Sequence, residues 1–291
     1  PGSPIAYWVS EKFIKTFKAQ RLKNISRARR GLETGNNEVY IKYWYEVNLN
    51  DIEFDCKNII KFNKKWLPHN KGGEYRNWYG NIDLIVWFKN DGEDIRKTGN
   101  INGYDVFLKE GITWTALTSY KNSYRFSPTG HTFDSNKGPL IVDNGDNILY
   151  YLLAFFISPI AQSINKILNP TLSLQNGDMD KLPIIFDDGK KSLIDELVQE
   201  NIYVTKKDWD SFETSWDFKS HPLLHFGVSV NSGLGSIEDN EIMAQSEISI
   251  EKTDNTFKIY EKNVPKNYTV ESAFDMWKDN CEQRFNKLKS N

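Results

Sequence analysis

The sequence has 291 residues, of which 39% are hydrophobic and 14% aromatic, and this apolar content excludes a disordered chain. The longest apolar run, Ile148–Ile157, is too short to cross a bilayer, and the two cysteines have no partner at zinc-ligand spacing. We therefore expect a globular cytoplasmic protein with no membrane contact, no disulfide framework and no metal site.

The net charge of −2 conceals an asymmetry between the two halves of the chain. Residues 1–140 carry 22 Lys and Arg against 15 Asp and Glu, whereas residues 141–291 carry 15 against 24. Eight basic residues fall within the first thirty positions. This distribution favours a polyanionic partner for the first half. A solvated helix face followed by a basic loop would give the same charge run.

The first half is predicted to be mostly β-structure after one helix. Ser3-Pro4 is typical of a helix start, and apolar residues at helical spacing continue to about Lys18. From residue 30 to 142, short β-branched and aromatic runs alternate with turn residues, including a turn at Asn90-Asp91-Gly92. The predicted strands are Val39–Val47, one at Trp66, Ile82–Phe88, Val106–Leu108, Ile112–Leu117, Tyr124–Phe126 and Pro139–Val142.

The second half is predicted to be mostly helical. Ile148–Ile157 is apolar on all faces and indicates a buried helix, and Ser158-Pro159 is typical of the cap of a second one. The remaining predicted elements are a return strand over 181–186, acidic helices over Ser192–Asn201 and Lys206–Phe212, and a last helix over Tyr268–Lys289. The fold class is therefore α+β, a mixed β-rich core with flanking helices and a helical C-terminal part.

We divide the chain into three parts. Residues 1–26 form a basic N-terminal helix and connector. Residues 27–186 form a recognition domain, with a β-rich core over 27–142, a helical pair over 146–168 and the return strand. Residues 187–291 form a helical C-terminal part, in which the glycine- and serine-containing stretch at about 227–262 indicates a flexible insertion. The chain opens on Pro1 without an initiator Met, so we expect a piece of a longer protein.

Catalytic motifs are absent from the sequence. It contains no phosphate-binding loop, no nucleophile elbow and no zinc-protease helix. His221 and His225 are separated by Pro222, which breaks any helix that would align them. The carboxylates of Asp208–Asp217 alternate with aromatic residues, which favours the polar side of a packed motif over an acid–base pair. We predict neither a catalytic nor a metal-binding residue.

Recognition chemistry is concentrated in three loops, residues 29–37, 69–79 and 109–119, with basic and amide residues following the third. Glycines let a backbone approach phosphate oxygens, and amide or guanidinium groups bind base edges. Generic turns would account for each loop taken alone. Predicted phosphate contacts, including backbone and hydroxyl donors, are Arg27, Arg29, Arg30, Lys71, Gly72, Gly73, Lys109, Ser119, Lys121 and Arg125. Candidates near bases are Thr34, Asn36, Asn37, Arg76, Thr113, Thr115 and Asn122.

Several long motifs resemble one family, from about Pro1 to Leu224 and again in the last helix. They resemble the C-terminal half of PglX, the adenine-specific DNA methyltransferases of BREX phage-defence systems. The motifs are Gly31-Leu-Glu-Thr-Gly-Asn-Asn37, Tyr43-Trp-Tyr-Glu-Val47, Asn70-Lys-Gly-Gly-Glu-Tyr-Arg-Asn-Trp-Tyr-Gly-Asn81, Asn90-Asp-Gly-Glu-Asp-Ile-Arg96, Lys109-Glu-Gly-Ile-Thr-Trp-Thr-Ala-Leu117, Ser158 with Pro170-Thr-Leu172, and Asp208-Trp-Asp-Ser-Phe-Glu-Thr-Ser-Trp-Asp-Phe218.

The resemblance implies a division of labour. In that family, S-adenosylmethionine and the flipped adenine bind an N-terminal domain with an Asn-Pro-Pro-Tyr motif. The nearest string here, Asn169-Pro170-Thr171-Leu172, lacks the aromatic residue that would stack on the base. The chain is thus expected to be a target-recognition region that binds duplex DNA and positions adenine, with no cofactor of its own. S-adenosylmethionine is expected only in the full-length enzyme.

Other partners and functions stay open at this point. The resemblance implies the N-terminal methyltransferase domain as a partner, with other BREX proteins or a phage-encoded DNA-mimic inhibitor as further candidates. A protein-interaction module would dock its partner on the acidic, Trp-bearing half. A sugar-binding β module is suggested only by the abundant Trp and Tyr. Binding of duplex DNA at two salt concentrations distinguishes these possibilities.

Overall fold

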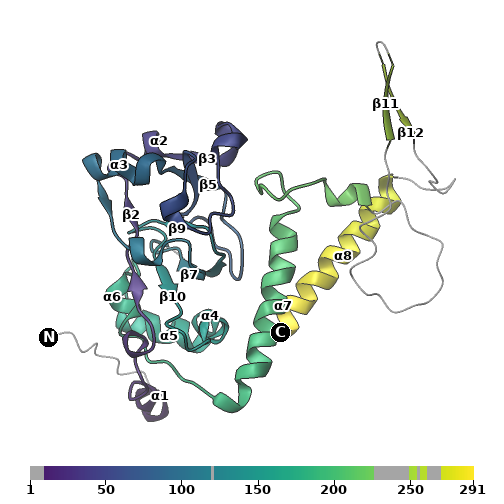
Figure 1. Cartoon of the computed structure of the whole chain (residues 1–291). Helices are drawn as coiled ribbons and strands as arrows, with labels where there is room; N and C mark the ends of the chain where they lie inside the picture. The colour runs from purple at the N-terminus through teal and green to yellow at the C-terminus, as the bar shows by residue number, and fades with distance from the viewer. Residues whose placement is uncertain (1–9, 119–120, 226–248, 254–255, 261–269) are drawn as a thin grey trace. The chain divides into compact units, whose positions relative to one another are not determined.

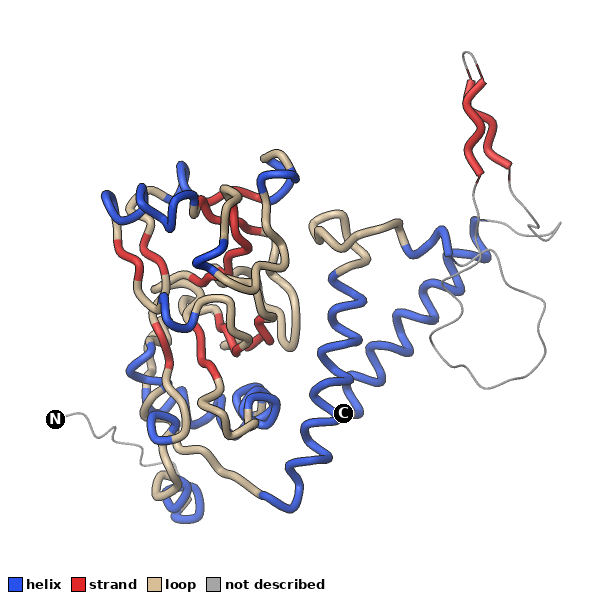
Figure 2. Tube along the Cα trace, viewed as in Figure 1, coloured by secondary structure: helices blue, strands red, loops and turns tan. Residues whose placement is uncertain are grey.

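The computed structural model describes residues 10–118, 121–225, 249–253, 256–260 and 270–291. The chain forms two compact units, Pro1–Trp216 and Asp217–Asn291. Figure 2 shows short strands joined by long loops in the first unit, together with helices in both. The predicted α+β class is confirmed. The predicted boundaries at 26/27 and 186/187 lie inside the first unit and stay predictions.

Two four-stranded sheets form the centre of the first unit (Figure 1). The first is antiparallel throughout, in the order β1 (Ala28–Arg29), β10 (Leu140–Val142), β7 (Gly111–Trp114) and β8 (Tyr124–Ser127). The second has the order β3 (Ile41–Tyr43), β5 (Leu84–Trp87), β4 (Trp66–Asn70) and β9 (Thr132–Phe133), with β4 and β9 parallel. A short ladder joins β2 (Leu32–Glu33) to β6 (Asn100–Ile101).

Helices cover the two ends of this β-structure. Figure 1 shows α2 (Asn37–Tyr40) and α3 (Lys89–Thr98) at one end, and α4 (Leu149–Ile157), α5 (Pro159–Leu168) and α6 (Asn176–Met179) at the other. The first sheet and α4 share one core, which contains the fully buried Trp114, Tyr124 and Phe156. A second core, beneath α3, contains Phe88 and Phe133. The first sheet contributes to both cores, because Leu140 and Val142 of β10 lie in the second.

The helical pair is confirmed where the sequence placed it. The Ser158 side chain accepts a hydrogen bond from the Ala161 backbone N–H at 3.2 Å, and Pro159 occupies the first turn of α5. Within the described residues, no single helix has the length and apolar content of a membrane span; α4 and α5 meet that test only as a pair bent by 73°.

Several predicted strands are shorter than expected or take another form. In the segment Val39–Val47, the Asn36 side chain accepts from the Val39 N–H and starts the turn of α2, so β3 begins only at Ile41. Val106 ends a 3₁₀ helix rather than starting a strand. The return strand over 181–186 reduces to one bridge between Arg21 and Pro183, closed by hydrogen bonds from the Leu22 N–H to the Leu182 carbonyl and from the Ile184 N–H to the Gln20 carbonyl.

The two predicted acidic helices are one helix, α7 (Lys191–Trp209). Its buried positions Val198, Asn201, Val204 and Thr205 continue one face through the segment that we predicted to be a break. The turn predicted at Asn90-Asp91-Gly92 is confirmed at the start of α3, where all three residues have left-handed backbone angles.

A helix lies toward each end of the described chain. Helix α1 (Glu11–Thr16) starts at Ser10, whose side chain accepts from the Phe13 N–H, while the predicted cap at Ser3 lies outside the described residues. In the second unit, α8 (Val270–Ser290) confirms the last predicted helix. Of the predicted insertion at 227–262, the structure describes the two strands of a hairpin, β11 (Ser249–Thr253) and β12 (Thr256–Tyr260).

The cap of α5 gives a test of the fold. Ser158→Ala removes the acceptor for the Ala161 N–H, so the free energy of unfolding should fall by about 1 kcal/mol. Urea denaturation measures this change. Ser163→Ala, at an exposed position in the same helix, is the matched control and should cause no comparable loss. Equal effects of both substitutions would contradict the capping role.

Candidate nucleic-acid interface

The second and third predicted loops meet in the structure. The Thr115 hydroxyl donates to the Gly73 carbonyl at 3.1 Å. Gly72 has a φ of +88°, and a Cβ added to it would lie 2.4 Å from the Lys137 carbonyl oxygen, so only glycine fits there. The Ala116 N–H donates to the same Lys137 carbonyl at 3.4 Å. Three chain segments that are distant in sequence are thereby held in contact.

Lys71 and Lys137 are the cations at this junction. Lys71 is half-buried, and burial lowers the pKa of its ammonium group, with Asp134 opposing and Lys137 adding to the shift. The nearly buried Asp134 carboxylate accepts from the backbone N–H groups of Asn136 and Lys137, both at 2.8 Å. This turn holds Lys137 at the surface. Lys137 is not among the predicted contacts, although the sequence Asp134-Ser135-Asn136-Lys137-Gly138 is typical of an Asx turn.

The end of the first predicted loop joins the same surface. A groove of about 390 Å³ is lined by Asn37, Lys42 and Lys71, together with Glu38, Ile41, Tyr43, Glu46 and Leu84. At the other side, the Thr118 hydroxyl donates to the Lys121 carbonyl at 3.3 Å. We call the set of residues joined by these contacts the basic stripe. It consists of Asn37, Lys42, Lys71, Gly72, Gly73, Thr115, Lys121 and Lys137.

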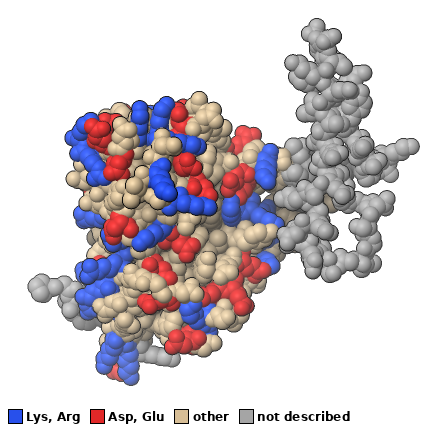
Figure 3. All heavy atoms as spheres, in the orientation of Figure 1, with Lys and Arg blue, Asp and Glu red and all other residues tan. Residues whose placement is uncertain are grey.

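The charge around the stripe is mixed rather than uniformly positive. On the face shown in Figure 3, Lys and Arg side chains lie among Asp and Glu side chains. Glu38 and Glu46 line the groove beside Lys42 and Lys71. A ligand with closely spaced anionic groups and polar edges suits such a surface better than one attracted by net charge alone.

Arg125 lies beneath the stripe rather than on it. Its side chain is buried, and its guanidinium donates to the Ser123 hydroxyl at 3.0 Å, the Thr115 hydroxyl at 3.2 Å and the Arg76 carbonyl at 3.3 Å. Burial, with a smaller effect of Arg76, lowers the pKa of Arg125 to about 10. The predicted phosphate contact is thus placed inside the protein, because its position on β8 faces inward.

Arg76 fastens its loop to the end of α7. Its guanidinium forms an ion pair with Asp208, donates to the Tyr79 carbonyl at 3.0 Å and lies 5.2 Å from the centre of the Trp209 ring. Asp210 forms an ion pair with Lys206, four residues earlier in the chain. The 208–217 segment is therefore the polar side of a packed motif, and Arg76 is engaged within it.

The remaining predicted base contacts differ in exposure. Thr34 is buried and donates to the Asn37 side chain at 2.6 Å, and Thr113 is also buried. Asn36 is exposed but caps α2. Asn122 is half-buried, and its carbonyl accepts from Gln162. Among these candidates, the structure brings Asn37 and Thr115 into the stripe.

Four predicted cations are not joined to the stripe by any described contact, and one predicted residue cannot be placed. Lys109 precedes β7 and Thr115 follows it, so the two lie at opposite ends of that strand. Arg29 pairs with Asp105. Arg27 and Arg30 flank β1 at the edge of the first sheet. Ser119 lies outside the described residues.

A buried polar network supports the stripe from below. His131 Nδ1 lies 3.3 Å from the Asn70 side-chain oxygen, and Asn70 donates to the Ser127 hydroxyl at 2.7 Å. His69 Nδ1 lies 3.0 Å from the Thr132 hydroxyl. Burial lowers the pKa of both histidines to about 3, so both are neutral near pH 7. This network lies directly before Lys71 in the chain.

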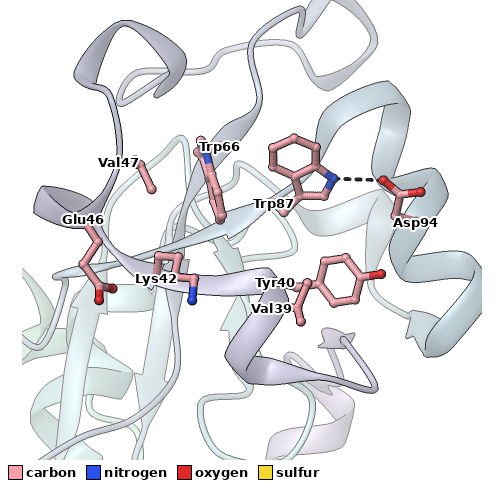
Figure 4. Close-up of a pocket in the computed structure, with 8 residues that line it drawn as sticks. All are labelled: Val39, Tyr40, Lys42, Glu46, Val47, Trp66, Trp87 and Asp94. Carbon is pink, nitrogen blue, oxygen red and sulfur yellow. Dashed lines mark hydrogen bonds between the residues drawn. The ribbon is translucent and has the colours of Figure 1, made fainter.

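An aromatic groove adjoins the stripe (Figure 4). It has a volume of about 580 Å³ and shares Lys42 and Glu46 with the smaller groove. Its walls include Tyr40, Trp66 and Trp87, with Val39, Val47 and Asp94 completing it. Figure 4 shows the Trp87 indole nitrogen directed at Asp94, to which it donates at 3.1 Å. This hydrogen bond lowers the pKa of the exposed Asp94 carboxyl.

Comparison with known proteins finds relatives among adenine-specific methyltransferases. The chain is 35% identical over 303 residues to the adenine-specific methyltransferase PglX of Lacticaseibacillus casei (strain Zhang), covering the whole chain and 22% of that protein. Over its whole length, the chain is similar to a segment of PglX. It is also 35% identical over 260 residues to the adenine-specific methyltransferase BrxX of Escherichia coli O9:H4 (strain HS), covering 88% of the chain and 21% of that protein. No family model matches the chain.

These matches confirm the resemblance to PglX found in the sequence motifs. The chain spans about a fifth of the length of PglX and BrxX. The similarity to PglX covers the whole chain, and so includes the loops that build the basic stripe.

The buried histidines give a pH-dependent test. In the unfolded chain they titrate near the ordinary value of 6.5, and in the folded chain at about 3, so the unfolded state binds more protons between these values. The free energy of unfolding should fall as the pH is lowered from about 6.5 toward 3. Urea denaturation across this range measures the slope, and His131→Gln should reduce it. An unchanged slope in that variant would contradict the buried neutral state of His131.

Proposed function

We propose that this chain is the target-recognition region of a BREX adenine-specific DNA methyltransferase, and that the basic stripe binds duplex DNA. One observation carries the proposal: four separate parts of the chain meet, with Asn37, Lys42 and Lys71 along one groove and the loop after Lys71 joined to Thr115 and Lys137. The methyltransferase relatives imply DNA as the substrate of the longer protein.

Each group in the stripe has a defined task in this proposal. The lysines neutralise phosphates and set the position of the chain on the duplex. The Asn37 amide, whose oxygen also accepts from Thr34, offers its N–H groups to a base edge, and the Thr115 hydroxyl lies in the same stripe, next to Gly73. Arg125 holds Thr115 from below and adds positive charge beneath the surface. Arg76 keeps the loop in place through Asp208.

The methyl donor belongs elsewhere in the longer protein. The relatives imply that the full-length enzyme uses S-adenosylmethionine. In this chain, Asn169 accepts from the Thr171 backbone N–H and hydroxyl, so Asn169-Pro170-Thr171 closes the end of α5. These residues do not fit a methyl donor or a flipped base, which requires an aromatic stacking partner. The chain would position adenine for a methyltransferase domain of the same cytoplasmic protein.

A second candidate function is docking of a protein partner. The aromatic groove and the exposed side chains of Val39, Tyr43, Tyr45, Leu49 and Ile60, all from one segment of 22 residues, favour it. A BREX protein or a DNA-mimic inhibitor could be that partner. The acidic half remains an alternative docking surface.

Salt dependence tests the DNA-binding function. If the stripe binds phosphates, the logarithm of the binding constant should fall linearly with the logarithm of salt concentration, and Lys137→Ala should reduce the slope by about 0.9 for all duplex sequences. Fluorescence anisotropy with labelled duplexes measures this slope. Lys57→Ala, an exposed lysine paired with Asp55, is the matched control and should leave the slope unchanged. Absence of DNA binding at low salt would favour the docking function instead.

A methyl-transfer assay tests whether this chain lacks catalytic activity of its own. Supplied with labelled S-adenosylmethionine and duplex DNA, the chain should incorporate no methyl groups, because the described residues build no site for the donor. Scintillation counting of the recovered DNA measures incorporation, with a full-length PglX relative as the positive control. Incorporation above the blank without protein would place catalytic residues in this chain.

A further inference from the structure

Two tyrosine side chains are stacked on the surface where β3 ends. The rings of Tyr43 and Tyr45 are nearly parallel, with 5° between their planes and 5.3 Å between their centres. Tyr43 is 42% exposed and Tyr45 is 55% exposed. Parallel rings at this separation are in contact, so the two side chains form one aromatic feature, which we call the tyrosine pair.

The segment that carries the tyrosine pair is held in place by its neighbours. The Tyr43 N–H donates to the Glu46 carboxylate at 2.7 Å. Trp44 packs edge-on against Tyr45, with 5.7 Å between the ring centres, and its indole N–H donates to the Thr214 carbonyl at 2.9 Å. Because these contacts already order the segment, binding of a ligand to the pair costs little conformational entropy.

Tyr43 lies at the smaller groove of the basic stripe. It lines this groove of about 390 Å³ together with Asn37, Lys42 and Lys71, so it is the ring of the pair that a ligand in the groove meets. The Lys42 ammonium donates to the Glu38 backbone carbonyl at 2.5 Å, which fixes its position without neutralising its charge. An exposed aromatic ring and two cations therefore share one groove.

The charges in this groove are balanced, which favours a nucleotide over a bare anion. Two carboxylates, those of Glu38 and Glu46, line the groove with the two lysines. A nucleotide offers a phosphate to the lysines and base amino groups to a carboxylate. Its flat base also matches the face of a tyrosine ring, on which any of the four bases can stack.

We propose that the tyrosine pair is a stacking platform for a base that has left the duplex. This inference rests on the proposed DNA-binding function and extends it to nucleotides outside the double helix. Inside a duplex the neighbouring bases cover both faces of each base, so only an unstacked base can lie on the Tyr43 ring. The lysines hold the phosphates beside it, and Tyr45 supports Tyr43 from the other face. The platform thereby stabilises DNA in the opened form that a base-modifying enzyme requires.

The test uses the full 291-residue chain and two labelled duplexes. One carries a single unpaired thymidine, and the other carries an abasic nucleotide at the same position, so the two have equal numbers of phosphates and differ in one base. Fluorescence anisotropy should show roughly tenfold tighter binding of the duplex with the unpaired base. Tyr43→Ala should bind both duplexes about equally and keep the salt slope of the original chain.

A fluorescent base gives a second measurement of the same contact. With 2-aminopurine in place of the unpaired thymidine, fluorescence should fall when the original chain binds, because stacking on a ring quenches this base. Tyr43→Ala should cause no comparable decrease. Tyr43→Phe keeps the ring and should retain both the quenching and the preference for the unpaired base.

Tyr203→Ala is the matched control, because Tyr203 is 48% exposed on α7, where its ring contacts Lys207. It should retain the preference for the unpaired base. Equal binding of both duplexes by the original chain, or an unchanged preference in Tyr43→Ala, would overturn the platform while leaving DNA binding in place. The exposed tyrosines would then favour docking of a protein partner. Failure to bind either duplex at low salt would overturn the proposed function, and the platform with it.

Discussion

The close packing of two glycine backbones decides where the polar loops of this protein lie. A Cβ added to Gly138 would be 2.8 Å from the Gly72 nitrogen and 2.9 Å from the Asn70 oxygen, so neither loop could approach the other with a larger residue. This contact brings Lys137 beside Lys71, and the Lys137 carbonyl then receives Ala116. Without this contact between Gly72 and Gly138, the three loops would not be held together.

Sequence patterns predicted the elements whose signals are local. The helical pair could be predicted because Ser158-Pro159 is a self-contained cap, and the C-terminal helix because its apolar period is long. The break predicted in α7 was wrong, since tertiary burial of Val204 and Thr205 continues the helix there. The strand predicted over 181–186 was wrong, since the pairing of this segment with the chain near Arg21 is confined to the single bridge at Pro183.

The sequence predicted which residue types the candidate site contains, but not where their side chains lie in the fold. Lys71, Gly72 and Gly73 were predicted from a glycine-rich basic loop that an ordinary turn would also explain; the structure places this loop at the basic stripe, and its contact with phosphates stays a prediction. Composition could not tell that Arg125 is buried, since the rest of the fold covers β8 on both faces and buries the neighbouring Tyr124 as well. Nor could it show that Lys109 and Thr115 lie at opposite ends of β7, or that a loop after α5 reaches the stripe.

The inward position of Arg125 separates the scaffold of the surface from its variable positions. The guanidinium fixes Thr115, Ser123 and the Arg76 carbonyl from below, and none of these bonds involves Asn37, Lys42 or Lys137. Residues that face outward can therefore be exchanged without disturbing the layer that holds the loops. A protein built in this way could acquire a new ligand preference through a few surface substitutions, because the buried residues that hold the loops stay unchanged. Libraries that randomise only the outward-facing residues of the basic stripe would be the most direct way to change which ligand the protein binds.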